Sequence, residues 1–303
     1  MAMAFGADAR EWVIRSIGTT ARSFEIVQLK GSTTSSVFLI QCSQGSKPQR
    51  FILRVIDNQE WLADEPDLVA HEAAALEEAQ KAGLRAPRIL ACSSEEVGFG
   101  APVVLMSFIE GNVEIQPSDF HGWLDGLAGE LSLVHQHRAN TFGWCYLSWV
   151  DKTALAPPKW TAIPHVWERA IDLVLNTAPD VHSVFIHRDY HPTNVLWRGG
   201  VVSGVVDWIS ACRGPAGVDV AHCRINLAKM FGLLAANQFL DAYIEAADGF
   251  EYDPYWDIDS LLDVCIPQPT FYPPWQEFGL DIITSEVLKQ RVDKYLESVM
   301  MRI

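Results

Sequence analysis

One stretch of the sequence decides how the rest is interpreted: His187-Arg188-Asp189-Tyr190-His191-Pro192-Thr193-Asn194, followed by Val205-Val206-Asp207-Trp208. An asparagine follows an aspartate after five positions (194 − 189 = 5), and a second aspartate stands at the end of a short apolar run. A carboxylate can accept a proton from a hydroxyl group, and carboxylate and amide oxygens are ligands that Mg²⁺ prefers. The spacing predicts a polar loop with an acid–base group, Asp189, and two metal-ligating side chains, Asn194 and Asp207.

Transfer of a phosphoryl group requires residues of these types. One carboxylate orients and deprotonates the attacking hydroxyl, and oxygen ligands hold Mg²⁺ on the phosphates of the nucleotide. A polar loop with coincidental spacing is the alternative. The apolar strands on both sides of the loop and the later Asp207 argue against that alternative.

The same stretch contains a pair of histidines four positions apart, His187 and His191, a spacing that binds zinc on some helices. Pro192 follows the pair directly, and the sequence lacks the glutamate of an H-E-x-x-H motif. We therefore expect His187 to brace the loop and do not expect a zinc site, although three further potential ligands follow: Cys212, His222 and Cys223.

The loop resembles that of the aminoglycoside phosphotransferase and choline kinase superfamily, which are small-molecule kinases with a protein-kinase-like fold. The loop of that family typically reads H-G-D-x-H-P-x-N, and His191-Pro192 matches it, whereas protein kinases usually have Lys at the position of His191. Asp219-Val220-Ala221 resembles the Asp-x-Ala segment that opens a helix of the C-terminal lobe. Only twelve positions separate the later aspartates (219 − 207 = 12), too few for a protein-kinase activation loop, so we do not expect a protein substrate.

The resemblance implies an α+β, bilobal protein-kinase-like fold, with a small antiparallel sheet and one main helix in the N-terminal lobe and a larger, mostly helical C-terminal lobe. A chain of 303 residues is long enough for two domains. We expect an N-terminal nucleotide-binding lobe over residues 1–106, a hinge over residues 107–111, and a C-terminal lobe with the catalytic loop and the acceptor site over residues 112–303.

Local patterns agree with this division. Apolar residues at helical spacing predict the main helix over Leu68–Ala82, with Asp67 as its N-cap and Gly83 after its end. Short β-rich runs separated by turn residues predict five strands: Phe24–Leu29, Ser36–Gln41, Arg50–Ile56, Ile89–Cys92 and Val103–Phe108. Later amphipathic segments predict helices, with a strand-rich island over Val184–Val206 between them: Phe120–His137, Pro164–Leu175, Val218–Phe231, Leu233–Ala247 and Ile283–Met300.

The resemblance assigns the binding of nucleotide phosphates to two features of the first third of the chain. Arg54 takes the place of the cation, usually Lys, that neutralises the α and β phosphates, and Glu72 takes the place of its partner on the main helix. A Ser/Thr-rich loop between two predicted strands would cover the phosphates, with Gly31, Ser32 and Thr33 as its candidate contacts. Taken alone, the loop fits an ordinary hairpin and the Arg–Glu pair fits a solvated surface.

The segment Val103–Gly111 resembles the interlobe hinge of the family. The resemblance places Met106 at the gatekeeper position and implies that the Ser107 carbonyl and the Ile109 N–H bind the adenine edge of ATP. A plain buried edge strand is the alternative for this segment.

The acceptor region is less defined. No Lys or Arg occurs between Lys229 and Lys289, while many acidic and aromatic residues do. Acidic groups beside aromatic rings suit a cationic, hydroxylated small molecule, and a solvated acidic surface over an aromatic core is the alternative. The candidate acceptor-binding residues are Asp253, Tyr255, Trp256 and Trp275.

Composition excludes several partners. The formal net charge of −15 disfavours binding to nucleic acids and to anionic membranes. No apolar stretch reaches the ~18 residues of a membrane span, and the six scattered cysteines are expected to be reduced thiols in the cytoplasm. The oligomeric state stays open.

These patterns predict a kinase that uses ATP and Mg²⁺ to phosphorylate a hydroxyl of a small, cationic, aminoglycoside-like acceptor. Two alternatives stay open: a nucleotide-binding, pseudokinase-like module, and a kinase for another small acceptor such as a macrolide, a choline-type compound, a sugar or an amino alcohol. A carbohydrate hydrolase with Asp257 and Asp259 as paired carboxylates would leave the N-terminal pattern unexplained.

Overall fold

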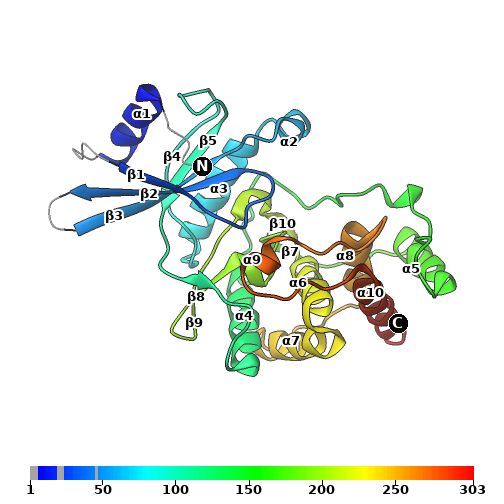
Figure 1. The fold of residues 1–303 in the computed structure, drawn as a ribbon. Helices are drawn as coiled ribbons and strands as arrows, with labels where there is room; N and C mark the ends of the chain where they lie inside the picture. The colour runs from blue at the N-terminus through cyan, green and yellow to red at the C-terminus, as the bar shows by residue number, and fades with distance from the viewer. Residues whose placement is uncertain (1–5, 19–23, 45–46) are drawn as a thin grey trace. The chain divides into compact units, whose positions relative to one another are not determined.

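The computed structural model describes residues 6–18, 24–44 and 47–303, which form two compact units (Figure 1). The first unit comprises the chain up to Gly111 together with Ser203–Ser210, and the second comprises Asn112–Val202 and Ala211–Ile303. The predicted C-terminal lobe was continuous from residue 112, whereas here the segment that contains Asp207 groups with the first unit. The fold class is α+β with an antiparallel sheet, as predicted.

The first unit is built on a five-stranded sheet with the order β1-β2-β3-β5-β4, in which all neighbouring strands are antiparallel. Its strands are β1 (Phe24–Gln28), β2 (Ser36–Gln44), β3 (Lys47–Val55), β4 (Ile89–Ser93) and β5 (Val103–Ser107). Each of the five predicted strands is present, with ends that differ by a few residues. The register opposes Arg54 of β3 to Val104 of β5.

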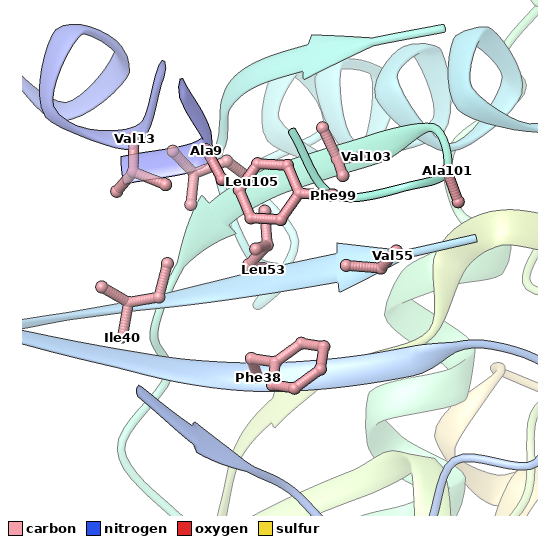
Figure 2. Packing of buried hydrophobic residues seen from close by; sticks show 10 residues of the cluster. All are labelled: Ala9, Val13, Phe38, Ile40, Leu53, Val55, Phe99, Ala101, Val103 and Leu105. Atoms are coloured by element: carbon pink, nitrogen blue, oxygen red, sulfur yellow. The ribbon is translucent and has the colours of Figure 1, made fainter. Parts of the chain in front are cut away.

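Alternation along β3 separates the two faces of this sheet. Leu53 and Val55 point into an apolar core, whereas Arg54 points to the other face, as the period of two predicts. Figure 2 shows this core, to which α1 (Ala7–Ile17) contributes Ala9 and Val13. The helix α1 was not predicted from the sequence, although its core-facing residues Ala9, Trp12, Val13 and Ile17 stand at helical spacing.

Two further helices belong to the first unit, α2 (Gln59–Asp64) and α3 (Leu68–Lys81). The main helix was predicted within one residue, and it packs against β4 and β5. Asp67 occupies the N-cap position, but its side chain makes no capping hydrogen bond. A short 3₁₀ turn, Trp208–Ser210, also packs on α3.

The second unit is mostly helical. Every residue of its central helix α6 from Ala216 to Met230 is buried, because α7 and α8 pack on it, and α4 packs against α7. The helices are α4 (Phe120–His135), α5 (Pro164–Asn176), α6 (Ala216–Phe231), α7 (Leu233–Ala246), α8 (Tyr255–Cys265), α9 (Pro274–Glu277) and α10 (Ser285–Met300). The sequence predicted all of these except α8 and α9.

Short strands frame the polar loop of the second unit. β7 (Ser183–Ile186) pairs antiparallel with β10 (Cys212–Pro215), and β6 (Asn112–Val113) pairs with β8 (Val195–Arg198). A turn follows β8: Gly199 and Gly200 both have positive φ and lead into β9 (Val201–Val205). Within the described ranges, no helix is both long enough and apolar enough to span a bilayer.

Candidate active site

The predicted catalytic loop, His187–Asn194, begins directly after β7 and is fixed at its start by α6. Asp219 of α6 accepts hydrogen bonds from the backbone N–H groups of His187 (2.6 Å) and Arg188 (2.7 Å). A carboxylate oxygen of Asp219 also lies 3.2 Å from Nε2 of His135 on α4. Burial raises the pKa of Asp219, but these hydrogen bonds and the nearby histidines bring it below its ordinary value, so the carboxylate stays ionised.

Arg188 has a left-handed backbone, with φ of 70°. Glycine adopts this conformation without strain, which is a physical reason for the glycine typical of this loop position in the resembling family. Here the arginine side chain supplies compensating contacts. Its Nη2 donates to Asp263 (2.9 Å) and to the Leu147 carbonyl (3.1 Å).

The guanidinium of Arg188 also contacts two aromatic rings. It lies 3.7 Å from the ring centroid of Trp149 and 4.6 Å from that of Tyr146. These cation–π contacts, together with the ion pair to Asp263, hold the loop against the segment that precedes α5 and against α8.

Asp189 is the only carboxylate of this loop and about a third of its side chain is exposed (34%). Its Oδ1 lies 3.1 Å from Nε2 of His222 and 3.5 Å from Nε2 of His191. Burial raises the pKa of Asp189, but the two histidines outweigh burial and hold the pKa well below its ordinary value. Asp189 is therefore an ionised, accessible carboxylate that can accept a proton.

Asn194 is positioned by Asp189 itself. Its Nδ2 donates to the Asp189 carbonyl (2.9 Å) and to Asp189 Oδ2 (3.2 Å). Because the amide nitrogen is used in this way, the amide oxygen Oδ1 is left to accept or to ligate a cation. Asp189 and Asn194, which stand five positions apart in the sequence, are thus in direct contact.

Arg54 contacts three polar side chains of the first unit, Asp207, Ser35 and Glu72. Its Nη2 is 2.8 Å from Asp207 Oδ1, its Nη1 donates to Ser35 Oγ (3.1 Å), and its Nε is 3.1 Å from Glu72 Oε1. The predicted Arg54–Glu72 pair is therefore present, although the Nε approach is too poorly directed to count as a hydrogen bond. The contacts of Arg54 with Asp207 and Ser35 were not predicted.

For Arg54 and for Glu72, burial and the charge of the ion-pair partner shift the pKa in opposite directions. Burial lowers the pKa of Arg54, but Asp207 and Glu72 raise it above its ordinary value, so the guanidinium is charged. Glu72 is almost fully buried, and burial raises its pKa to about 7 because Arg54 is shared with Asp207 and compensates only in part.

The residues predicted to bind Mg²⁺ fit that ion chemically. Asp207 uses Oδ1 for Arg54, and its side chain is one third exposed, so Oδ2 can ligate a cation. Asn194 offers an amide oxygen, and oxygen donors of these two kinds suit Mg²⁺. Asp207 belongs to the first unit and Asn194 to the second. Among the described residues, no three His, Cys, Asp or Glu side chains gather as ligands of one metal ion.

The predicted phosphate loop connects β1 and β2. Gly31 has φ of 96°, and Ser32 Oγ donates to the Ser35 carbonyl at 2.5 Å, which closes the loop as a tight turn. Thr33 is exposed. Ser35, which the sequence analysis missed, connects this loop to Arg54. The local signal for it was only the run of Ser and Thr residues.

The predicted adenine-binding residues lie on β5 and just after it. Met106 is buried, and it is opposite Ile52 of β3 in the sheet. The N–H of Ser107 donates to the Arg88 carbonyl (2.9 Å), and its Oγ accepts from the Arg88 N–H (2.8 Å). Ile109 is half-buried in the irregular segment after β5.

The structure brings together only some of the candidate acceptor residues. Asp253 and Trp256 line a cavity of about 560 Å³ in the second unit. Tyr255 is buried at the start of α8, and Trp275 is fully buried in a separate apolar cluster with Ile115 and Met230. Val184 and Pro215 also line the cavity, which places it beside the end of β7 that is remote from the catalytic loop.

Three carboxylates of α8 are compensated inside the protein. Asp257 pairs with Arg224 and Arg302, Asp259 pairs with Lys152 and accepts from Tyr146, and Asp263 pairs with Arg188 and accepts from Ser148. These carboxylates are therefore neither a solvated acidic surface nor a free pair for hydrolysis. The sequence indicated their charge but not their partners, which come from distant parts of the chain.

His222 is the functional candidate that sequence reasoning considered only as a zinc ligand. It follows Asp219 by three positions on α6, and residues three apart share one face of a helix. This spacing was the available signal that His222 faces the catalytic loop, where Asp219 already binds.

Known proteins resemble this chain in sequence and in fold. The sequence model of a family described as the phosphotransferase enzyme family matches residues 25–256. A homoserine kinase from Chelativorans sp. (strain BNC1) is 30% identical over 160 residues, which are 46% of this chain and 49% of that protein. The matched region thus spans about half the length of this curated relative.

Solved structures show the same fold. A protein from Ralstonia eutropha JMP134, proposed to be an aminoglycoside phosphotransferase, aligns over 98% of each chain with 14% identity and a TM-score of 0.68. Macrolide 2'-phosphotransferase MphH from Brachybacterium faecium aligns over 84% of this chain and 88% of its own, with 16% identity and a TM-score of 0.59. A variant of aminoglycoside phosphotransferase APH(4)-Ia, solved with ADP and hygromycin B, aligns over 96% of this chain and 99% of its own, with 17% identity and a TM-score of 0.60.

The family match covers far more than half of the chain, and it includes Arg54, Glu72, the catalytic loop and Asp219. The resemblance first noted at His187–Asn194 is therefore confirmed, and the chain belongs to the phosphotransferase enzyme family.

Proposed function

We propose that the protein is a kinase that transfers the γ-phosphoryl group of ATP to a hydroxyl of a small molecule. The observation that supports this most directly is the environment of Asp189, an ionised and partly exposed carboxylate with Asn194 bonded to it. An accessible, ionised carboxylate can accept a hydrogen bond from an acceptor hydroxyl and so orient it, and Asp189 meets both conditions.

In this proposal Asp189 orients the acceptor hydroxyl and accepts its proton as the oxygen attacks the γ-phosphorus. Asn194 and Asp207 ligate Mg²⁺, which neutralises charge on the phosphates when it is bound. Arg54, held by Glu72, neutralises the α and β phosphates. The β1–β2 loop covers the phosphates, with Gly31, Ser32 and Thr33 as its contacts.

For the adenine, we propose the backbone of Ser107 and Ile109, with Met106 as the gatekeeper. Residues 1–106 would then be the nucleotide lobe, residues 107–111 the hinge, and residues 112–303 the lobe that contains the acceptor site. This proposal is supported by the place of Met106 and Ser107 on β5, next to the strand that contains Arg54.

For the acceptor, we propose a small hydroxyl compound that also has an amine. The curated relative is a homoserine kinase, and one solved neighbour holds hygromycin B; both compounds combine hydroxyl and amine groups. The net charge of −15 attracts cations in general. Of the four candidate acceptor residues, Asp253 is exposed, whereas Tyr255 and Trp275 are buried.

The test is a phosphorylation assay with purified protein, Mg²⁺–ATP and a panel of homoserine, choline, aminoglycosides, macrolides and sugar alcohols, read by mass spectrometry. We expect one class to gain a phosphoryl group, and Asp189→Asn to lower kcat by about 10²–10⁴-fold. The matched control is Asp125→Asn, which removes an exposed carboxylate on α4 and should leave kcat unchanged.

Two results would contradict the proposal. Full activity in Asp189→Asn would remove Asp189 as the base. Binding of Mg²⁺–ATP without any phosphorylated product would favour the pseudokinase-like module instead.

A further inference from the structure

We propose that His222 is a positioning residue for the reaction: its Nε2–H holds the carboxylate of Asp189 in the orientation that accepts the proton of the acceptor. This inference rests on the proposed function, since it assigns His222 a role through Asp189.

The helix α6 holds the catalytic loop at two points. Asp219 accepts from the first two backbone N–H groups of the loop, and one turn later His222 reaches the side chain of Asp189. The same helix face thus fixes the backbone of the loop through Asp219 and its carboxylate through His222.

The two oxygens of Asp189 have different partners. Oδ1 lies 3.1 Å from His222 Nε2, and Oδ2 accepts from the Asn194 amide at 3.2 Å. A donor at each oxygen opposes rotation of the carboxylate about its terminal torsion, which is otherwise broad. His191 is a weaker partner, because its Nε2 is 3.5 Å from Oδ1 and also 3.3 Å from Asn194 Nδ2.

The hydrogen of this contact belongs to His222. An ionised carboxylate only accepts hydrogen bonds, so Nε2 must be the protonated nitrogen. The side chain of His222 is 6% exposed, and its Nδ1 has no hydrogen-bond partner among the described residues. Asp189 is therefore the hydrogen-bonding partner that selects the form of the ring.

Packing keeps the His222 ring in place. Its centroid lies 5.9 Å from the Trp149 ring in an edge-to-face arrangement and 6.0 Å from the His191 ring. Trp149 is held in turn by the guanidinium of Arg188. The neighbours of His222 thus fix the direction in which Nε2 points.

The first test compares three variants in kinetics with the acceptor found in the panel. His222→Phe keeps an aromatic ring beside Trp149 but has no donor, whereas His222→Gln keeps an N–H donor on a flexible side chain; His222→Ala has neither. We expect kcat to fall by about 100-fold in the Phe and Ala variants and to be partly restored in the Gln variant. The KM for ATP should stay near the wild-type value in all three.

A purely structural role of the ring gives the opposite order, because Phe would then preserve kcat and Gln would not. Wild-type kcat in His222→Phe overturns the proposal, and so does an equal loss of kcat in the Phe and Gln variants. Thermal unfolding of each variant shows whether the fold is retained.

The second test does not depend on an acceptor. Long-range ¹H–¹⁵N NMR spectra of the histidine rings in the full chain show which nitrogen of His222 bears the hydrogen. We expect a protonated Nε2 in the wild type and loss of that preference in Asp189→Ala. A neutral Nδ1–H ring in the wild type overturns the proposal even if the protein is an active kinase. Conversely, if no panel compound is phosphorylated, the proposed function fails, and the NMR result still decides whether His222 holds Asp189.

Discussion

Arg188 shows how a single position can combine backbone strain with a stabilising role for its side chain. Its left-handed φ of 70° is unfavourable for a long side chain such as arginine, yet its guanidinium makes a buried ion pair with Asp263 and contacts Trp149 and Tyr146. Relief of the strain is worth about 1 kcal/mol, whereas breaking a buried ion pair costs about 3–5 kcal/mol. The side-chain contacts therefore decide the stability at this position.

We predict that Arg188→Gly lowers the free energy of unfolding by about 3 kcal/mol, although glycine suits the backbone, because Asp263 is left buried and unpaired. Urea unfolding monitored by circular dichroism measures the change. The double variant Arg188→Gly with Asp263→Asn should recover part of the loss, since it removes the uncompensated charge. A stabilised single variant would show that backbone strain dominates.

Glu72 gives a pH dependence of known sign. Its pKa is raised to about 7 from an ordinary value of 4.5, so between these values the folded protein binds a proton that the unfolded chain has released. The free energy of unfolding therefore decreases as the pH rises from the ordinary carboxyl range to about 7, by about 3 kcal/mol from this group. Below about pH 4.5, the contribution of Glu72 to the free energy of unfolding is fully present.

We predict that Glu72→Gln removes this decrease. Urea unfolding of the wild type and the variant at about pH 5 and about pH 8, without nucleotide or Mg²⁺, gives two differences to compare. The wild type should lose more stability than the variant between the two pH values. Equal losses would show that Glu72 titrates near its ordinary pKa.

At the scale of the elements, the packing of α6 against α8 depends on a glycine at the start of α6. A Cβ on Gly217 would lie closer than 3.0 Å to the indole of Trp256, the first-turn residue of α8 that lines the cavity. The absence of a side chain at Gly217 thus determines where Trp256 can sit. Gly129 on α4 is the matched contrast, because a Cβ there would meet no atom within 4 Å.

We predict opposite effects of the same substitution at these two glycines. Gly217→Ala should lower the free energy of unfolding by about 1–3 kcal/mol, because Trp256 must shift, whereas Gly129→Ala should raise it by about 0.5–1 kcal/mol through helix propensity alone. Thermal unfolding and the fluorescence of the tryptophans measure both effects. Equal stabilisation of the two variants would show that Trp256 can shift without lowering the free energy of unfolding.

At the scale of the whole molecule, acidic charge is compensated locally rather than globally. The chain has a formal net charge of −15, yet the carboxylates of α8 are paired with cations from remote segments. In the first unit, Arg54 joins Glu72 and Asp207 although 153 positions separate Arg54 from Asp207. The excess negative charge therefore lies mainly outside these clusters.

We predict that Mg²⁺–ATP stabilises the whole protein by about 2.7 kcal/mol when ATP is at a hundred times its Kd, since a ligand that binds only the folded state shifts the unfolding equilibrium. Differential scanning fluorimetry measures this as a rise in Tm of a few degrees. In Asp207→Asn the Mg²⁺-dependent part of the rise should be lost, whereas Asp125→Asn should behave as the wild type. The same rise with ATP and a chelator would contradict the role of Asp207 in Mg²⁺ binding.

Local sequence by itself determined the five strands of the sheet, α3, and the polar loop in which Asn194 follows Asp189 by five positions. Strand alternation, helical spacing and the spacing of five positions between Asp189 and Asn194 each involve only a few neighbouring positions. They can therefore be recognised without any tertiary contact. The opposite directions of Leu53 and Arg54 on β3 followed from the same local rule.

Only the tertiary structure decided which charges meet. It paired Arg54 with Asp207, placed Ser203–Ser210 with the first unit, buried Trp275 away from Asp253, and brought His222 to Asp189. The partner of a buried charge or ring is set by which distant segments pack next to it. Local periodicity in the sequence does not determine how close two distant segments lie.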